Sequence, residues 1–595
     1  MNTSLGTSQA AYNRLLLFVA GLGGLLYGID VGIIAGALPY LEATSGLGPG
    51  QLSFIVAAVL LGNVISSLVA GALADWLGRR TLMVLSALMF VASIPMIALA
   101  HGFEPLVLGR LLQGISAGLI GVVVPLYLAE CLGASNRGKG TGIFQWLLTF
   151  GFVVASLITL YFSYRLSAVM KLGDAAAIFA FKDHAWRNTF WVSLPAGILF
   201  AAGSSLVSES PRWLFRRGKP AASMAALLRS RTQEQADFEV RAMEATAARS
   251  ATTSTGAKIR ESLVRRKYVV PFVLACVILT CNQLTGINSI IGYNTTILLQ
   301  GGLSDYQAHF GSLFFSIVNF GITIIGVMLV DRKGRKFLLS LGSAGIILSL
   351  LGTGILFYRT QARQVDVKSA VQAMVQPSGS LSVAFNGATA DKLLASVGRT
   401  ANGTAQSLEI IYSYGDFRSV TNIVRSNETS VPIHVVRSLP ANAVAAFFSN
   451  PFGNLAASRN APLKIDAAQI APVPSLTNGW IVALTLFLFM GFYAVGPGVC
   501  VWLALSELMP TRIRSNGMSI ALFLNTATST VIAASFLPTV GKYGYSTIFF
   551  FFAACSAVYF VTAAFFLPET KGKTLEEIEE HFEGASGRSE LAAAR

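Results

Sequence analysis

The sequence predicts an all-α membrane protein whose twelve transmembrane helices form two related six-helix halves. Hydrophobic residues make up 53% of the 595 residues and charged residues only 12%, about half the charged share of a soluble domain. Apolar runs recur along the chain, each close to the length of about twenty residues that crosses a bilayer as a helix. Charged motifs in the first part of the chain recur in the second part, which indicates an internal repeat.

The apolar runs define the expected spans, and the loops between them carry unequal charge. The spans are expected at residues 14–41, 51–74, 81–101, 105–131, 140–163, 188–207, 268–300, 307–330, 337–358, 477–504, 515–540 and 545–567. The short loops at 42–50, 101–105 and 300–306 contain no lysine or arginine, whereas the opposite loops are basic and the net charge is +15. Because cytoplasmic loops are enriched in these residues, we expect both termini in the cytoplasm of a plasma-membrane protein. The charge then reflects topology and does not predict a nucleic-acid partner.

Polar inserts between the spans complete the expected organisation. The regions are an N-terminal half (1–207), a cytoplasmic helical linker (208–267), a C-terminal half in two parts (268–358 and 476–568), an extracytoplasmic insert (359–475) and a cytoplasmic tail (569–595). A shorter external segment is expected at 164–187. The insert is long for a loop, so it is either a small domain or disordered. Alternating apolar residues at 408–412 and 431–436 favour strands within it.

The internal repeat lies in the basic loops. The segment Asp75–Arg80 recurs at 331–336, Glu130 with Arg137 recurs as Glu507 with Arg514, and Glu209 recurs as Glu569. Arginines that pair with these carboxylates could close the cytoplasmic side, and two parallel halves suit alternating access. The candidate gate residues are Asp75, Arg79, Arg80, Glu130, Arg137, Glu209, Arg212, Asp331, Arg335, Glu507, Arg514 and Glu569. Loop charge that only sets the topology is the alternative interpretation.

The first apolar run, 15–41, contains a single acid, Asp30. A charge near the bilayer centre costs at least ~2.5–3.5 kcal/mol on insertion scales, so it needs a partner and usually has a function. Helix geometry places Asp30 ~6 Å and Arg110 ~7 Å from the outer face, so the two can pair. A carboxyl group beside an arginine releases its proton more readily than one moved away from it. A helix shift could therefore load and release a proton, although a static ion pair is also possible.

Uncharged amides and an indole are spread over several expected spans. Amides both donate and accept hydrogen bonds, and aromatic rings pack on apolar faces, so together they suit a sugar. The candidate substrate-binding residues are Gln145, Asn282, Gln283, Asn288, Asn319, Trp502 and Asn525. Hydrogen bonds between helices explain any one amide alone, whereas the set favours a neutral ligand, because no charged residue joins it. Gln283 and Asn288 are five residues apart, so we expect Gly286 to interrupt the seventh span.

These motifs together resemble those of the sugar porters of the major facilitator superfamily. The matching segments are 28–32, 75–80, 109–114, 127–130, 209–214, 283–288, 331–336, 506–507 and 568–572. The resemblance covers the twelve spans and the linker but not the insert. It implies the twelve-helix fold of two halves, and it makes an enzyme improbable. The five histidines lie in loops or near span ends, and the sequence contains no metal-binding spacing.

The resemblance also assigns roles to residues. It implies that the amides other than Asn282, together with Trp502, contact a sugar, and that Tyr27, Tyr293 and Tyr493 line the path. In this family an acid at the position of Asp30 marks proton-coupled members. The departures from the family pattern are Asn282, Gly292, Phe152 and Thr526, which leave the choice between a sugar and a polyol open. We expect a monomeric symporter that is driven by protons without a cofactor. A passive uniporter and a nutrient sensor remain alternatives.

Overall fold

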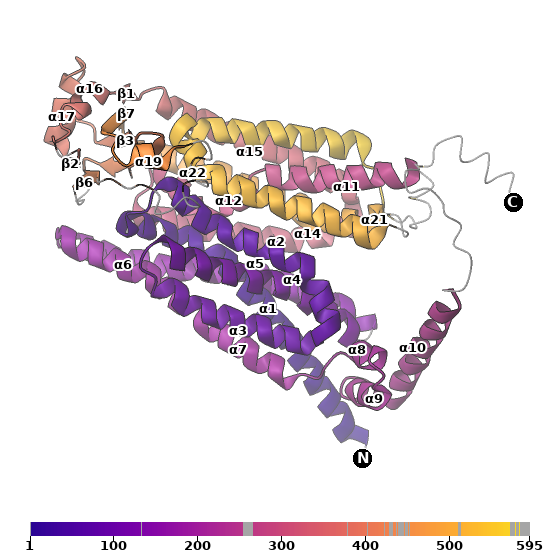
Figure 1. The fold of residues 1–595 in the computed structure, drawn as a ribbon. Helices are drawn as coiled ribbons and strands as arrows, with labels where there is room; N and C mark the ends of the chain where they lie inside the picture. Colours follow the sequence, from indigo (N-terminus) through magenta and orange to yellow (C-terminus); the bar gives the residue numbers. More distant parts are fainter. Residues whose placement is uncertain are drawn as a thin grey trace.

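The computed structural model consists of two bundles of long helices that lie side by side (Figure 1). It describes residues 2–571, 578 and 582, apart from residues 133, 254–265, 378, 402, 422, 428–431, 436, 438, 440–445, 447–449, 451–452 and 510–512. The insert lies at one end of the bundles, called here the insert end, and helices α8–α10 lie at the other, called the linker end. The start of α1 also lies at the linker end.

The first half contains seven helices joined by short turns. They are α1 (Asn2–Ser45), α2 (Pro49–Leu77), α3 (Arg79–Ala98), α4 (Phe103–Cys131), α5 (Ala134–Met170), α6 (Ala175–Trp191) and α7 (Leu194–Leu206). The short external segment expected at 164–187 is mostly helical, because α5 and α6 fill most of it. The chain first turns at Gly173, which has a φ of 69°, and Asp174 then caps α6 by accepting from the Ala176 amide at 2.9 Å. Helix-forming residues continue both helices up to this turn.

The second half repeats this arrangement. Its helices are α11 (Arg266–Leu284), α12 (Ile287–Gly292), α13 (Asn294–Gln300), α14 (Asp305–Lys333), α15 (Arg335–Gln361), α20 (Leu476–Val495), α21 (Pro497–Leu508) and α22 (Arg514–Val561), followed by a π-helical turn at Thr562–Phe566. The described chain has 11 candidate membrane spans, and the last covers 50 residues. A straight helix of that length would be ~75 Å long, more than twice the ~30 Å bilayer core. It bends at Gly544 (φ 82°) into two antiparallel arms (Figure 1), which suits the predicted count of twelve.

The predicted interruption at Gly286 is confirmed. Gly286 has a φ of 80° and separates α11 from α12. A Cβ atom there would lie 2.3 Å from the ring of Phe552, so both the backbone conformation and the close packing require glycine. A second interruption at Tyr293 separates α12 from α13. The seventh span therefore runs as three helical pieces, which lets polar side chains from the breaks turn toward the interior.

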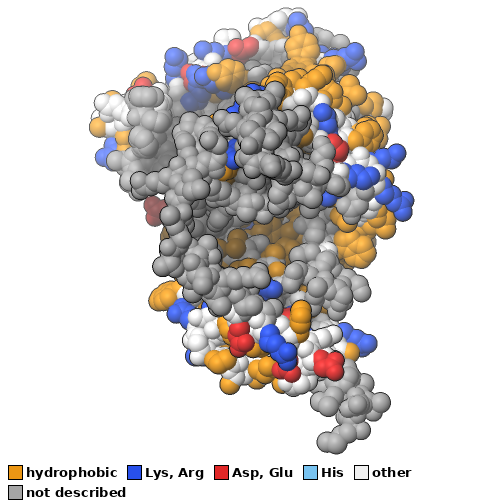
Figure 2. All heavy atoms as spheres, turned by 90° about the vertical axis from the view of Figure 1, so that its right-hand side faces the viewer, with side chains coloured by type: hydrophobic (Ala, Val, Ile, Leu, Met, Phe, Trp, Pro, Cys, Tyr) orange, Lys and Arg blue, Asp and Glu red, His pale blue; other side chains and the backbone are white. Residues whose placement is uncertain are grey.

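The linker is helical over its described part and packs against the first half. It contains α8 (Pro211–Arg216), α9 (Pro220–Leu228) and α10 (Gln233–Thr253). The Arg231 guanidinium donates to the Cys131 carbonyl at 3.0 Å, and the Tyr12 and Ser208 hydroxyls lie 2.7 Å apart. Figure 2 faces this end and shows lysine and arginine side chains around a recess with hydrophobic side chains between the halves. The basic loops of the sequence therefore gather at the linker end.

The insert is a small folded domain over its described part. Its elements are β1 (Val365–Asp366), α16 (Lys368–Gln372), β2 (Leu381–Val383), α17 (Gly387–Ala395), β3 (Gln406–Tyr414), β4 (Phe417–Val420), β5 (Val424–Arg425), β6 (Ile433–Val435), α19 (Leu455–Ser458) and β7 (Leu463–Pro472). The main sheet has the antiparallel order β1-β7-β3-β4, with β5 also paired to β3, and β2 pairs with β6. Strands β3 and β6 match the predicted ones, and Leu408, Ile410 and Ile470 are buried in the core of the domain.

One face of strand β3 packs on this core and the other faces the helices. Leu408, Ile410 and Tyr412 point into the core of the insert, so Glu409 and Ile411 lie on the opposite face. Burial, together with the smaller effect of the nearby Glu42 carboxylate on α1, raises the pKa of the Glu409 carboxyl to about 7. The sheet therefore covers the insert end of the helical bundles.

Candidate functional site

Asp30 and Arg110 form a buried pair between α1 and α4. The Asp30 Oδ1 and Arg110 Nη1 atoms are 3.7 Å apart, and each side chain is 1% exposed. Neither carboxylate oxygen of Asp30 has a hydrogen-bond partner among the described residues. Arg110 instead donates to Gln113 Oε1 at 2.6 Å, and its guanidinium lies 5.7 Å from the ring centre of Phe190. The two groups therefore lie at the same depth, as the sequence predicts, but their contact is loose.

Four polar side chains around the Gly286 break form one network. Gln283 Nε2 donates to Asn525 Oδ1 at 3.1 Å, and Asn288 Nδ2 donates to Gln283 Oε1 at 2.9 Å and to Ser529 Oγ at 2.7 Å. Asn525 donates in turn to the Leu279 carbonyl at 2.9 Å. Because these amides bond to one another, ligand hydroxyls can replace the internal bonds without leaving a polar group unpaired.

The predicted tyrosines differ in their surroundings. The Tyr493 hydroxyl lies 3.4 Å from Asn282 Nδ2, and the Tyr27 hydroxyl accepts from Asn63 at 3.0 Å. Tyr293 is fully buried and stacks on Phe536 with ring centres 4.4 Å apart. Its hydroxyl donates to the Ala533 carbonyl at 3.0 Å. In this structure Tyr293 packs between α13 and α22 and does not line an open path.

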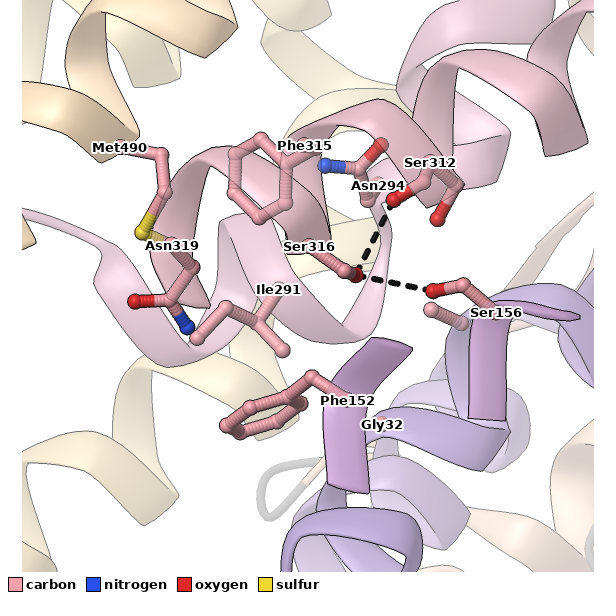
Figure 3. Close-up of a pocket in the computed structure, with 11 residues that line it drawn as sticks. Gly32, Phe152, Ser156, Ile291, Asn294, Ser312, Phe315, Ser316, Asn319 and Met490 are labelled. Carbon is pink, nitrogen blue, oxygen red and sulfur yellow. Dashed lines mark hydrogen bonds between the residues drawn. The ribbon is translucent and has the colours of Figure 1, made fainter. Parts of the chain in front are cut away.

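A small cavity lies where the two halves meet (Figure 3). Its lining includes Gly32 and Phe152 of the first half and Asn294, Ser316 and Asn319 of the second. It encloses only about 10 Å³, the space of roughly one water molecule. The Ser156 and Ser316 hydroxyls cross the interface at 2.8 Å. The first half contributes a mainly apolar wall, because Gly32, Ala35 and Phe152 line it beside the single hydroxyl of Ser156. A sugar would need the halves to separate.

Asn294 is the residue that sequence reasoning missed. Its side chain is 1% exposed, and neither its amide nitrogen nor its amide oxygen has a hydrogen-bond partner among the described residues. Figure 3 shows it beside Ser312 and Phe315. It is the first residue of α13, directly after the second interruption. An asparagine within an apolar run was the only available signal. A buried amide without a hydrogen-bond partner at the wall of a cavity is expected to bond to a water molecule or a ligand in that cavity.

The remaining predicted substrate residues lie in different surroundings. Gln145 lies exposed on α5, and it does not line the cavity of Figure 3. The side chain of Trp502 on α21 lies outside the described part of the structure. Asn319 lines the cavity and accepts from Thr323 at 3.4 Å. The structure therefore brings together the amides of α11, α12 and α22 in one network, places Asn319 of α14 in the wall of the small cavity, and leaves Gln145 exposed on α5.

The charged motif at the linker end of the first half forms a compact network. Arg79 contacts Glu130 through Nε and Nη2 at 2.9 and 3.0 Å, and both residues are buried. Arg79 also lies 2.9 Å from Asp75. Glu209 caps α3 by accepting from the backbone amides of Arg79 and Arg80 at 2.8 and 3.1 Å. A carboxylate at a helix N-terminus is stabilising, so this motif fixes the joint between α2 and α3.

The second half repeats the same contacts. Arg335 donates to Glu507 at 3.0 Å, and Glu569 accepts from the Arg335 backbone amide at 3.1 Å. The Thr570 hydroxyl donates to Glu507 at 2.6 Å, as the Ser210 hydroxyl does to Glu130. Among the residues that the structure describes, the contacts of each network stay within one half. Each pair therefore orients the helices of its own half.

The remaining gate candidates have less defined roles. Arg212 is exposed, while Arg216, which the sequence did not indicate, lies 3.5 Å from both Asp75 and Glu130. The Arg80 guanidinium donates to the Ser205 carbonyl. The side chains of Arg137, Asp331 and Arg514 lie outside the described part of the structure.

At the insert end, side chains from both halves meet. The Tyr40 hydroxyl of α1 donates to Asp305 Oδ2 of α14 at 2.8 Å, and the Ser163 hydroxyl of α5 donates to the same oxygen. Tyr40 also stacks on His309 with ring centres 5.4 Å apart. Contacts between the halves therefore close this end, whereas Figure 2 shows a recess at the other.

Comparison with known proteins agrees with this geometry. The family model described as "Sugar (and other) transporter" matches residues 16–377 and 466–582, so the unmatched stretch between the two matched parts, 378–465, lies within the insert. The glucose transporter GlcP of Staphylococcus epidermidis is 26% identical over 95% of this chain and 97% of its own length. The human proton myo-inositol cotransporter is 26% identical over 96% of this chain and 82% of its own length.

A solved structure has the same fold. The xylose transporter XylE of E. coli, in a partially occluded inward-open conformation, covers 95% of this chain and 100% of its own with a TM-score of 0.63 at 19% identity. The family and these relatives are membrane transporters and not enzymes. The chain therefore belongs to the sugar (and other) transporter family, the sugar porters of the major facilitator superfamily.

Proposed function

We propose that this transporter carries a neutral sugar or polyol into the cell together with protons. The observation that carries the proposal is the loose, buried pair of Asp30 and Arg110. A buried carboxylate without hydrogen-bond donors is costly, so a proton on Asp30 removes the cost in this state. When a shift of α1 relative to α4 brings the arginine closer, the charged form is stabilised and the proton leaves.

The polar groups of the central region support the substrate class. The amides of Gln283, Asn288, Asn319 and Asn525 are uncharged, and they match the hydroxyl groups of a sugar or polyol. The relatives include a glucose transporter and a myo-inositol cotransporter. The transporter then lies in the plasma membrane, and its basic linker end faces the cytoplasm. We infer a monomer that is driven by the proton gradient without a cofactor.

Transport assays on the purified full chain in sealed vesicles test the proposal. With an acid exterior, a labelled sugar or polyol should accumulate above its outside concentration, and with equal pH it should only equilibrate. D-glucose and myo-inositol are the first probes. Equilibration without accumulation under both conditions would indicate a passive uniporter, and absence of counterflow for every probe would favour a sensor.

Asn294 provides a test of the central site. We expect Asn294→Ala to raise the apparent KM about five- to a hundredfold, because the amide nitrogen and oxygen can each form one hydrogen bond to the solute. Each bond contributes ~0.5–1.5 kcal/mol, and 1.4 kcal/mol is tenfold. Thermal stability should not fall, since the amide has no partner to lose among the described residues. The matched control is Asn188→Ala, at an exposed position on α6, which should leave KM unchanged. A normal KM in Asn294→Ala would remove this residue from the site.

A further inference from the structure

A second and larger cavity lies at the insert end, between the insert and both halves. It encloses about 290 Å³, close to the lower limit of the ~300–1,000 Å³ range of small-molecule pockets. Its walls include Tyr40 of α1, Ser163 of α5, Thr296 of α13, Asp305 of α14 and Arg425 of the insert. It is therefore distinct from the closed cavity of Figure 3, with which it shares no lining residue.

The cavity wall combines apolar and polar residues, and its charges balance. Its charged residues are two acids, Glu42 and Asp305, and two bases, Lys182 and Arg425. The other polar groups are mostly hydroxyls and one amide, Gln300. Such a wall offers no excess charge for an ion, whereas hydroxyl groups that both donate and accept find partners on every side. The chemistry favours a neutral, polyhydroxylated solute.

One wall residue has unused hydrogen-bonding capacity. The side chain of Thr296 is buried, with 6% exposed, and its hydroxyl has no hydrogen-bond partner among the described residues. Burying a hydroxyl group without a hydrogen-bond partner is unfavourable. Because Thr296 lines the cavity, a hydroxyl-bearing ligand there would remove this cost.

The insert holds the roof of the cavity in place. The guanidinium of Arg425 on β5 donates to the carbonyls of Leu299 and Leu303, at the end of α13 and in the turn before α14. A cation at the C-terminal end of a helix is stabilising. The turn is fixed from another side by Asn478 of α20, whose side-chain nitrogen donates to the Gly301 carbonyl at 2.9 Å. The roof is thus built by residues of the insert together with α13 and α20.

From this arrangement we propose that the vestibule under the insert is a second binding site for a neutral polyhydroxylated solute of monosaccharide size. The solute would lie beside Asp305, whose Oδ2 accepts from Tyr40 and Ser163 and so closes the insert end. A solute bound there would contact the hydrogen-bonded residues that must separate before it can reach the central site. This inference rests on the proposed function for the class of the solute and for the placement of the insert end outside the cell. The site itself does not require proton coupling.

Cysteine protection in the full chain tests the site. Ser167 lines the cavity, and Leu172 nearby is 75% exposed. Ser167→Cys and Leu172→Cys are made in a background with Cys276→Ser and Cys555→Ser, since the other three cysteines are buried. Each variant is labelled with a maleimide in the presence of D-glucose or myo-inositol. A probe at ten times its Kd should slow labelling at position 167 about tenfold by mass action and leave position 172 unaffected.

Two further variants locate the protection. Thr296→Val keeps the shape and removes the hydroxyl, so it should abolish protection at position 167. Asn294→Ala weakens the central site and should leave the protection intact. Protection that persists in Thr296→Val, that disappears in Asn294→Ala, or that appears equally at position 172 would overturn the vestibule site. Protection by L-alanine, and not by D-glucose or myo-inositol, would also overturn it, because the ligand would then be a zwitterion.

Counterflow of the same probe separates this proposal from the proposed function. Counterflow without protection overturns the vestibule site and leaves transport standing. Protection without counterflow supports the vestibule site and overturns transport of that solute. If neither is observed for D-glucose or myo-inositol, the vestibule proposal fails together with its substrate class.

Discussion

Asp30→Asn is expected to abolish proton-driven accumulation while leaving exchange intact. In the wild type, a pH difference of one unit supplies ~1.4 kcal/mol per proton, enough for about tenfold accumulation at one proton per solute. The amide has nearly the shape of the protonated acid, and the site is buried between α1 and α4. The variant should therefore bind and exchange solute but bring it only to its outside concentration.

The measurement is uptake into vesicles with an acid exterior, together with counterflow at equal pH. The matched control is Glu104→Gln, an exposed acid in the first turn of α4, which should accumulate solute like the wild type. If Asp30→Asn still accumulated solute tenfold, Asp30 would be only a structural partner of Arg110. If both variants lost accumulation, a general effect of removing an acid would explain the result.

The second large effect is expected in stability, at the linker end of the first half. Arg79→Met leaves Glu130 buried without its guanidinium, and breaking a buried pair in this way costs ~3–5 kcal/mol. The internal repeat provides the comparison. Arg335 and Glu507 make the same contact but are 13% and 24% exposed, so water can solvate the carboxylate that Arg335→Met leaves. That variant should lose clearly less stability.

Thermal unfolding of the purified variants in one detergent measures the difference. The double variant Arg79→Met with Glu130→Leu should recover part of the loss, because neither charge then remains alone. Equal losses at Arg79 and Arg335 would contradict the argument from burial. An additional loss in the double variant would mean that Glu130 matters chiefly through its contact with Ser210.

The sequence predicted the features that depend on a local or repeated pattern. Gly286 interrupts the seventh span because its φ is positive and Phe552 packs against it. The repeated motifs place Arg79 against Glu130 and Arg335 against Glu507 in the same geometry. Depth along two helices was enough to pair Asp30 with Arg110. In each case a spacing in the chain fixes the position.

Other features depend on tertiary packing that no spacing encodes. The second interruption, at Tyr293, carries neither glycine nor proline, so the position of Asn294 in the wall of the cavity was not predicted. Tyr293 is buried because it stacks on Phe536, which lies far away in the sequence. The order of the strands in the insert likewise depends on the pairing of β3 with β7, which lie far apart in the sequence. The resemblance ended at this insert, and no motif in it indicated the vestibule.

The attachment of the insert has a consequence for transport. Its chain leaves the end of α15 at Gln361 and returns to α20 at Leu476, and Arg425 fastens it to α13, all within the second half. Whenever the second half rotates, the sheet must be carried with it as a rigid attachment. The rim facing α1 and α5 is then the side that widens, so incoming solute would enter laterally, under an overhang, and its admission would depend on the angle between the halves.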